Sequence, residues 1–242
     1  MNDGTISATL RGGFQEVSND GVKFTLVSSS GRTELDEFIV LAYGNSAQFL
    51  RQHANSGDRI VAQGRLSSEK LDTDSYHTAV TVNRVLSISP AENGIDFSRV
   101  VVSGAASCDE VKTVGQNGRQ LANLNIANSR KYMSRDGEER SYTTYLNATL
   151  WGDRATQLES DGLIPMENEQ VMIEGILKPR SYMNREGQEI SKIDIWIDEL
   201  VFSQAQYSQQ PRRKQAPQQQ EQQPNSQPVQ QQQTKNLDSS PF

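Results

Sequence analysis

Alternating apolar and polar residues mark the strands of this chain, and residues 145–151 show the pattern most clearly. Successive residues of a strand point to opposite faces of the sheet. One face of this segment therefore carries Leu146, Ala148 and Leu150. The other carries Tyr145, Asn147, Thr149 and Trp151. The apolar face is the natural core face, so two large aromatic rings stand on the polar face, where folding alone gives little reason to place them.

The same kind of pattern occurs in two zones with one order of elements. In the first zone we expect strands at 6–12, 22–27, 37–44, 59–66 and 76–88, with a helix at 46–53. In the second zone we expect strands at 99–104, 122–127, 145–152, 170–177 and 190–202, with a helix at 153–159. The pair Tyr43-Gly44 corresponds to Trp151-Gly152, and Gly64 corresponds to Gly175. The two zones are therefore repeats of one plan.

Five strands with a short helix between the third and fourth, in roughly a hundred residues, are typical of the OB-fold, a five-stranded Greek-key barrel. We predict an all-β protein with two tandem OB-folds. A diverged N-terminal barrel covers residues 1–95, and a C-terminal barrel that provides the main binding surface covers residues 96–205. Residues 206–242 are rich in Gln, Pro and Ser, with few large apolar side chains. We expect this tail to be disordered.

The exposed rings of the second zone indicate a binding surface. Flat aromatic side chains beside cations are how proteins stack unpaired nucleobases, at about 1–3 kcal/mol per base. The aromatic candidates are Tyr132, Tyr145, Trp151 and Tyr182. The basic candidates for phosphate contacts lie around the same loops and are Arg130, Lys131, Arg135, Arg140, Arg154, Lys178, Arg180 and Arg185. Segments 133–140 and 183–188 carry Asp-Gly or Glu-Gly turns and are predicted to be hairpin tips that fold over a nucleic acid strand.

Each candidate also has a purely structural interpretation. Tyr145 and Trp151 could pack against the other domain or a partner subunit, and Tyr132 and Tyr182 could be ordinary surface tyrosines. Any one of the basic residues could be a solvated charge. Trp196 stands between Asp194 and Asp198 on one strand face, and these carboxylates would repel phosphate. We therefore interpret Trp196 as an interface or domain-packing residue.

Composition limits the alternatives. The net charge of −6 argues against binding by bulk positive charge but permits a local basic groove. We expect no membrane span, no secretory signal, no metal site, no cofactor and no catalytic activity, because the sequence lacks the corresponding motifs. The single cysteine, Cys108, cannot form an intramolecular disulfide, which fits a reducing compartment. We expect a cytoplasmic, nucleoid-associated protein.

Three segments of the second zone, at 97–104, 121–127 and 171–177, resemble the bacterial single-stranded DNA-binding protein family. Their shared pattern is an apolar first strand ending in Gly, an Ala-Asn second strand and an Ile-Glu-Gly strand after the helix. The resemblance implies that bases stack at four aromatic positions, which match Tyr132, Tyr145, Trp151 and Tyr182. Three of the four are Tyr where the family often has Trp, and Tyr offers a smaller stacking face.

The first zone departs from this pattern. Glu37, Ile39 and Leu41 stand where the second zone has Tyr145, Asn147 and Thr149, and Leu71 replaces Tyr182. Tyr43 alone keeps its aromatic ring. Apolar residues on the groove face indicate that this face is covered, so we expect the first zone to bind DNA weakly and to contribute more to assembly.

The end of the chain also resembles the family, whose members close with an acidic tip and Pro-Phe that docks on replication, recombination and repair enzymes. The matching residues are Asp238, Pro241 and Phe242, although Asp238 is the only acidic residue in the last seven. Single-domain members of the family assemble four barrels as tetramers. A chain with two barrels is therefore expected to reach four as a homodimer.

These observations favour a protein that binds single-stranded DNA without sequence specificity during replication, recombination and repair. Two other functions stay open. An OB-fold adaptor of a primosome-type assembly would need no set of four rings on one barrel. An RNA-binding OB protein would use the same rings, and nothing in the sequence reports on a 2′-hydroxyl.

Overall fold

The ten strands and two helices predicted from the sequence are all present in a computed structural model that describes residues 1–18, 20–29, 35–70, 76–108, 110–115, 117–134, 136–166 and 168–202. The elements of the first half are β1 (Asn2–Ser18), β2 (Gly21–Ser28), β3 (Asp36–Tyr43), α1 (Gly44–His53), β4 (Asp58–Lys70) and β5 (Tyr76–Pro90). Those of the second half are β6 (Phe97–Ser107), β7 (Val111–Val114), β8 (Arg119–Met133), β9 (Glu139–Trp151), α2 (Asp153–Ser160), β10 (Glu169–Met183) and β11 (Glu189–Phe202). The tail predicted from residue 206 lies outside the described residues.

Each half closes into a barrel with the same connections. In the first half β1 pairs with both β2 and β4, and β3 pairs in parallel with β5. In the second half β6 pairs with both β8 and β10, and β9 pairs in parallel with β11. This is the five-stranded OB-fold topology. The prediction of an all-β protein with two tandem OB-folds is confirmed.

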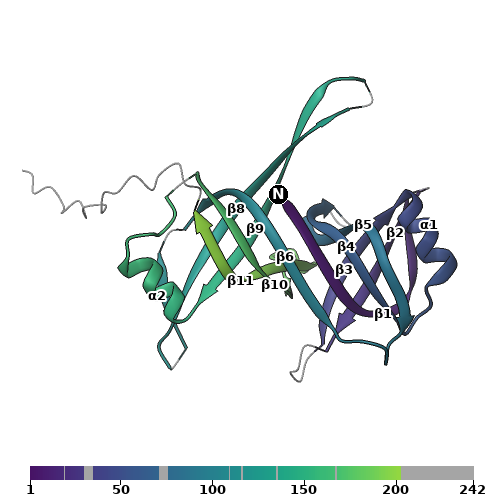
Figure 1. Ribbon diagram of the computed structural model, residues 1–242, viewed down its shortest axis with the longest axis horizontal. Helices are drawn as coiled ribbons and strands as arrows, with labels where there is room; N and C mark the ends of the chain where they lie inside the picture. Colours follow the sequence, from purple (N-terminus) through teal and green to yellow (C-terminus); the bar gives the residue numbers. More distant parts are fainter. Residues whose placement is uncertain are drawn as a thin grey trace, which may run out of the picture. The chain divides into compact units, whose positions relative to one another are not determined.

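Strand β7 was not predicted. It carries only two apolar residues, Val111 and Val114, too few to show a strand period. It forms because the chain turns back after Val114, which pairs with Arg119 at the start of β8. The strands β8 and β9 are also longer than predicted and form a projecting hairpin (Figure 1). Tyr132 consequently lies within β8, not after it.

The two barrels share one continuous sheet because their first strands pair with each other. Strand β1 pairs with β6 in antiparallel register from Asn2↔Val102 to Ser7↔Phe97. The two strands lie side by side in Figure 1, where β1 is purple and β6 is blue-green. The described strands therefore form a single eleven-stranded sheet, and both barrels belong to one compact unit. The boundary predicted between residues 95 and 96 falls in the connection between β5 and β6.

The alternation in residues 145–151 sorts the side chains as expected. Leu146, Ala148 and Leu150 are buried in the second barrel. They pack with residues from the other strands of that barrel, including Leu124, Ile126, Ile173 and Ile195. The core face of β9 therefore points inward, and its aromatic face points out of the barrel.

Corresponding glycines sit at the same irregularity in both barrels. A register shift precedes Gly64 in the pairing of β4 with β5, and another precedes Gly175 in the pairing of β10 with β11. A side chain at Gly64 would collide with the carbonyl oxygen of Thr81, and one at Gly175 would collide with that of Trp196. Only glycine permits this close backbone approach. The correspondence of Gly64 with Gly175 is confirmed.

A buried ion pair fixes the connection between the barrels. The Arg59 guanidinium on β4 binds the Asp96 carboxylate, and the side chains of both residues are only 9% exposed. Asp96 also accepts hydrogen bonds from the backbone N–H of Ser29 at 2.7 Å and from its hydroxyl at 3.1 Å. Burial alone would raise the pKa of Asp96, but the hydrogen bonds from Ser29 and Arg59 outweigh it and lower the pKa.

Replacing Asp96 with Asn should destabilise the fold by about 3 kcal/mol at neutral pH, because Arg59 would keep its charge in a buried site without a counter-ion. The folded pKa of Asp96 is lowered, so its stabilising effect is present above the unfolded pKa of about 4 and is lost as the pH falls through the folded pKa. Chemical denaturation followed by circular dichroism measures both effects. The free energies of unfolding of wild type and Asp96→Asn should converge in acid.

As a control, Glu139→Gln removes an exposed ion pair and should lower the free energy of unfolding by less than about 1 kcal/mol. If Asp96→Asn and Glu139→Gln lower the free energy of unfolding equally at pH 7, the buried Arg59–Asp96 pair is not a main stabilising interaction.

Candidate nucleic-acid interface

The outward face of β9 forms the centre of the candidate interface. Tyr145 is 75% exposed, the highest exposed fraction of any aromatic side chain among the described residues. Asn147 is exposed, Thr149 is nearly buried and Trp151 is half-buried. A ring as exposed as that of Tyr145 contributes little to the folding energy and leaves a face free for a planar ligand.

Trp196 belongs to this face, and its interpretation as an interface or domain-packing residue stays a prediction. Strand β11 pairs with β9 so that Trp196 lies beside Thr149. The rings of Trp151 and Trp196 meet edge to face, with centroids 5.9 Å apart and planes 65° apart. Lys178 Nζ lies 5.4 Å from the Trp196 centroid. The sequence argument considered the carboxylates of β11 and not the strand that pairs beside them.

Arg119 is a residue of this face that the sequence argument missed. Its guanidinium carbon lies 4.8 Å from the centroid of the Trp151 ring. The residue two positions later, Leu121, pairs directly with Trp151 across β8 and β9. This pairing would have indicated that Arg119 lies near the ring. The contact leaves a cation at one end of the aromatic face.

Two polar atoms near these rings have no partner. Among the described residues, Trp151 Nε1 and Asp194 Oδ1 are buried side-chain atoms without a hydrogen bond. Buried polar atoms of this kind are rare in native proteins and call for a partner. Both atoms lie beneath the surface of this face.

A depression of about 430 Å³ lies on this side of the second barrel. Its lining is mostly amide and charged and comprises Glu110, Lys112, Asn123, Leu124, Asn125, Asn147, Ala148, Thr149, Arg180 and Asp194. Thr149 donates a hydrogen bond to Asn123 Oδ1 at 3.1 Å. Amide side chains both donate and accept hydrogen bonds, which suits contact with a polar ligand.

Two hairpins carry the other predicted tyrosines. Tyr132 on β8 and Tyr182 on β10 are each 43% exposed. A guanidinium lies near each ring, with Arg130 5.9 Å from Tyr132 and Arg180 5.3 Å from Tyr182. The hairpin turns form at residues 134–138 and 184–188, where Gly137 and Gly187 adopt positive φ angles. Both predicted hairpin tips are therefore confirmed.

Four of the seven predicted basic residues that the structure describes, Lys131, Arg140, Lys178 and Arg180, are paired with carboxylates. Lys131 binds Glu139 at 2.7 Å, and Arg140 binds Glu138 at 3.3 Å. Arg180 binds Asp194 within the depression. These exposed or half-exposed pairs are weak and could exchange a carboxylate for a phosphate. Arg185 is exposed at the turn of the second hairpin, and Arg135 lies outside the described residues.

Comparison with known proteins assigns the second barrel to a family. The model of the Single-strand binding protein family matches residues 97–203, which run from the start of β6 to the end of β11. Residues 97–203 belong to this family. The chain is also 27% identical over 120 residues to Single-stranded DNA-binding protein B of Bacillus subtilis, covering 50% of this chain and 98% of that protein.

Solved structures of the single-strand binding family share the fold of both barrels. The wild-type single-stranded DNA binding protein from Thermus aquaticus has a TM-score of 0.60 at 15% identity, over 84% of this chain and 93% of that one. A deletion mutant of the same protein has a TM-score of 0.59 at 15% identity, over 84% and 94%. At this identity the likeness shows the fold alone. It extends the arrangement of the family barrel to the first half of the chain.

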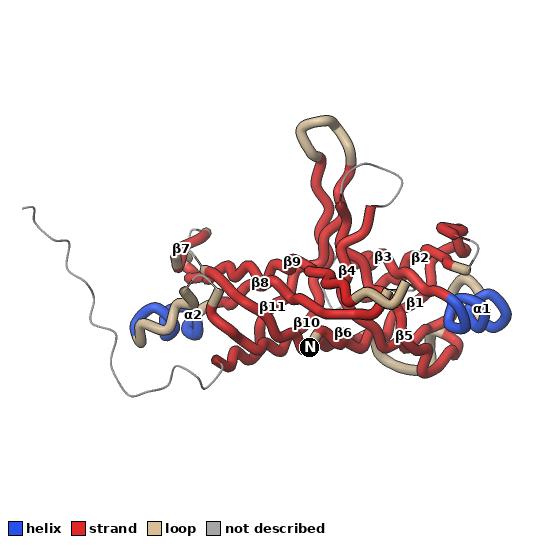
Figure 2. Tube along the Cα trace, turned by 90° about the horizontal axis from the view of Figure 1, so that it is seen from above, coloured by secondary structure: helices blue, strands red, loops and turns tan. Residues whose placement is uncertain are grey.

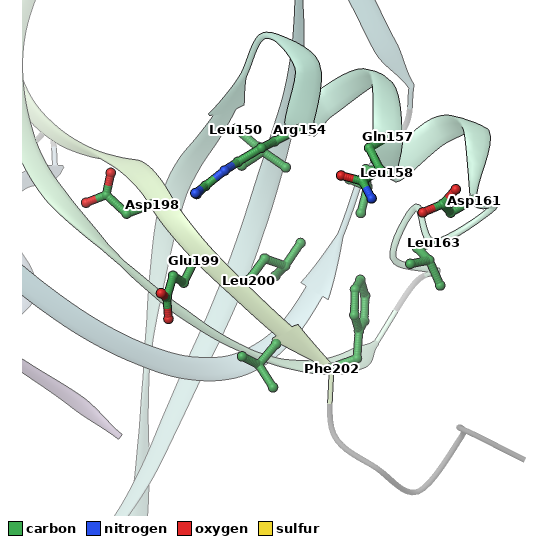
Figure 3. A pocket seen from close by; sticks show the side chains of 11 residues that line it. Leu150, Arg154, Gln157, Leu158, Asp161, Leu163, Asp198, Glu199, Leu200 and Phe202 are labelled. Atoms are coloured by element: carbon green, nitrogen blue, oxygen red, sulfur yellow. The ribbon is translucent and has the colours of Figure 1, made fainter.

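Arg154 lies apart from the other predicted residues of the family barrel. It lines a second depression, of about 370 Å³, between helix α2 and the end of β11 (Figure 3). Asp198 and Glu199 line the same depression, and Figure 3 shows the Arg154 guanidinium directed toward Asp198. Arg154 therefore lies beside carboxylates and away from the aromatic face of β9.

The corresponding face of the first barrel is partly covered, as the sequence predicts. Leu41 is completely buried and packs with Ala79 and the half-buried Ile39. Strands β10 and β11 lie against this barrel, where Lys178 binds Asp36 at 2.7 Å. The Ser191 N–H donates to His77 Nδ1, and Lys192 donates to the Tyr76 carbonyl oxygen. Leu71, the counterpart of Tyr182, lies outside the described residues.

Two further features bear on other functions. No group of three or more His, Cys, Asp or Glu side chains in the described ranges is placed to hold a metal ion. None of the helices in that part of the chain has the length and apolar character needed to cross a membrane.

Proposed function

We propose that the protein binds single-stranded DNA without sequence specificity by stacking bases on the second barrel. The observation that carries this proposal is the Tyr145 ring, 75% exposed on the strand that also holds Trp151. Trp196 extends the same aromatic face, and Tyr132 and Tyr182 stand on the flanking hairpins. The family match and the DNA ligand in the name of the Bacillus subtilis relative support DNA as the ligand.

Cations around the rings would hold the phosphates, which explains how a chain of net charge −6 can bind a polyanion. The residues nearest the rings are Arg119, Arg130, Lys178 and Arg180. Lys131, Arg140 and Arg185 lie on the two hairpins and would add contacts along the strand. Arg135, which lies outside the described residues, belongs to the same proposal through its place in the sequence between Lys131 and Arg140. Because the contacts go to backbone phosphates and ring faces, they carry no base sequence information.

The wider role we propose is to protect exposed strands during DNA replication, recombination and repair in the cytoplasm, in association with the nucleoid. Asp238, Pro241 and Phe242 would recruit replication and repair proteins, with the Phe ring in an apolar pocket. These three residues lie outside the described part of the chain. Binding alone accounts for this role, so the proposal includes no catalytic step and no cofactor.

Single substitutions in the aromatic face should weaken binding. Tyr145→Ala and Trp151→Ala should each lower the affinity for oligo-dT by about 5- to 150-fold, which corresponds to the loss of one stacked base. Fluorescence anisotropy of labelled oligo-dT at fixed salt measures the change. Phe49→Ala removes an exposed ring from helix α1 and is the control, with affinity expected to stay unchanged. If Tyr145→Ala and Trp151→Ala both keep wild-type affinity, the stacking site is excluded. An adaptor or an assembly factor would then be the better description.

Asp194 should weaken DNA binding, because its carboxylate occupies Arg180. Asp194→Asn frees this guanidinium for a phosphate and should raise the affinity for oligo-dT by about two- to tenfold. The slope of log affinity against log salt should also steepen by about 0.7, the value for one extra phosphate contact on a single strand. Asp198→Asn, on the same strand but beside Arg154, is the control. If Asp194→Asn and Asp198→Asn change the affinity for oligo-dT equally, Arg180 is not a phosphate contact.

We further propose that two chains form a homodimer, which would bring four barrels together. An apolar surface on the second barrel supports this. Met172 and Val201 are exposed and pair side by side across β10 and β11. Exposed apolar neighbours of this kind are typical of interaction surfaces when they form a contiguous patch.

A charge at the centre of this surface should separate the subunits. Met172→Glu is expected to give a monomer of about 27 kDa in light scattering coupled to size exclusion, against a dimer for wild type. Met183→Glu places the same charge on an exposed methionine of the hairpin and should leave the dimer intact. A monomeric wild-type protein, or a dimer that survives Met172→Glu, would show that this surface is not the interface.

A further inference from the structure

The depression between helix α2 and the end of β11 combines an apolar floor with an acidic rim. The apolar side chains that form its floor pack against the core of the second barrel and are Leu150, Leu158, Leu163, Leu200 and Phe202. Figure 3 shows Asp198 and Glu199 on one side of this floor and Asp161 on the other. Its volume of about 370 Å³ lies in the range of about 300–1,000 Å³ that is usual for ligand sites.

The rim carries more negative than positive charge. Asp161, Asp198 and Glu199 are its carboxylates, and Arg154 is the one cation among the described residues that line the depression. All four residues are exposed. An excess of negative charge repels phosphate groups and attracts cationic ones. The rim therefore suits a basic ligand and not a nucleic acid.

The depression lies apart from the aromatic face to which we assign DNA. Leu150 belongs to the core face of β9, whereas Thr149 and Trp151 belong to its outward face. None of the residues that line this depression also lines the one beside Thr149. Figure 1 and Figure 2 both show helix α2 away from the projecting β8–β9 hairpin, which carries Tyr132. A ligand beside α2 would therefore leave the aromatic face open.

The plan of the barrel does not require these charges. The two helices begin at corresponding Tyr43-Gly44 and Trp151-Gly152 pairs, and Gly64 and Gly175 set the register of corresponding strands. The first-barrel counterparts of Arg154, Gln157, Asp161, Asp198 and Glu199 are consequently Ser46, Phe49, His53, Asn83 and Arg84. All three carboxylates are thus replaced in the first barrel, where the ring centroids of Phe49 and His53 lie 4.6 Å apart. The acidic depression is particular to the second barrel.

We propose that this depression binds a basic segment of a partner protein that carries one large apolar side chain. The apolar side chain would enter between α2 and β11 and cover Leu200 and Phe202. Lysine or arginine residues before and after it would meet the carboxylates on the two sides of the floor. Ion pairs at such exposed positions are weak, so the buried side chain supplies most of the affinity and the carboxylates select the partner. The partner would be held on a barrel whose aromatic face stays free.

A short peptide tests this inference on the full-length protein. The probe is a fluorescein-labelled peptide with one tryptophan between two pairs of lysines, followed by anisotropy at about 0.15 M salt, where distant charges are screened. Wild type should bind it with saturation. A peptide with alanine in place of the tryptophan should bind about tenfold more weakly, because the burial of a large apolar side chain is lost.

Charge variants show whether the peptide occupies the depression. Asp198→Asn combined with Glu199→Gln should weaken binding of the tryptophan peptide by about three- to tenfold. The matched control combines Asp153→Asn with Glu159→Gln, which removes two exposed carboxylates of α2 that do not line the depression. This control should bind the peptide as wild type does.

A further variant copies the first barrel into the second. Gln157→Phe combined with Asp161→His places the counterparts Phe49 and His53 on α2 and should weaken peptide binding by a similar factor. Thermal unfolding and oligo-dT affinity of every variant should match wild type, which shows that the fold and the DNA site are intact. The inference is overturned if wild type does not prefer the tryptophan peptide, or if Asp198→Asn with Glu199→Gln behaves like its control. Neither result would affect the proposed function, because oligo-dT binding is measured separately on the same proteins.

Discussion

The antiparallel pairing of β1 with β6 is the interaction on which the rest of the structure depends. Each of these strands uses one part of an edge to close its own barrel and another part to join the other barrel. Backbone hydrogen bonds leave little freedom of register, because a slip of one residue would turn every side chain to the opposite face. The shared sheet therefore fixes where the hairpins of the second barrel lie against the first, through Lys178–Asp36 and Tyr142–Ser68.

Two copies of one barrel plan consequently have different surfaces. In the second copy, Tyr145, Trp151 and Trp196 form an outward aromatic face with Arg119, Lys178 and Arg180 close by. In the first copy, Leu41 is buried at the position of Thr149 and Glu37 pairs with Arg11 at the position of Tyr145. The two barrels therefore differ in the residues that they offer for binding.

The sequence predicts features that depend on the local alternation of apolar and polar residues, or on positions where only glycine fits. Alternation in residues 145–151 predicts the core face of β9, and Gly64 and Gly175 are recognisable because no other residue fits against the neighbouring carbonyl. What it misses depends on which strands become neighbours. The pairing of β9 with β11 brings Trp196 to Trp151, and that of β8 with β9 brings Arg119 over the ring. The carboxylates that pair with Arg180 and Lys178 likewise come from distant segments.

The central claim is that the aromatic face of the second barrel takes up unpaired bases. It is tested most directly by titrating the full-length protein with oligo-dT while following its tryptophan fluorescence at low and high salt. Trp151 and Trp196, the two tryptophans of the chain, both lie on this face, so stacking should quench the emission until the strand saturates the site. Quenching that saturates and requires more strand at high salt is the predicted result. Unchanged emission from the folded protein with every strand length would contradict the account.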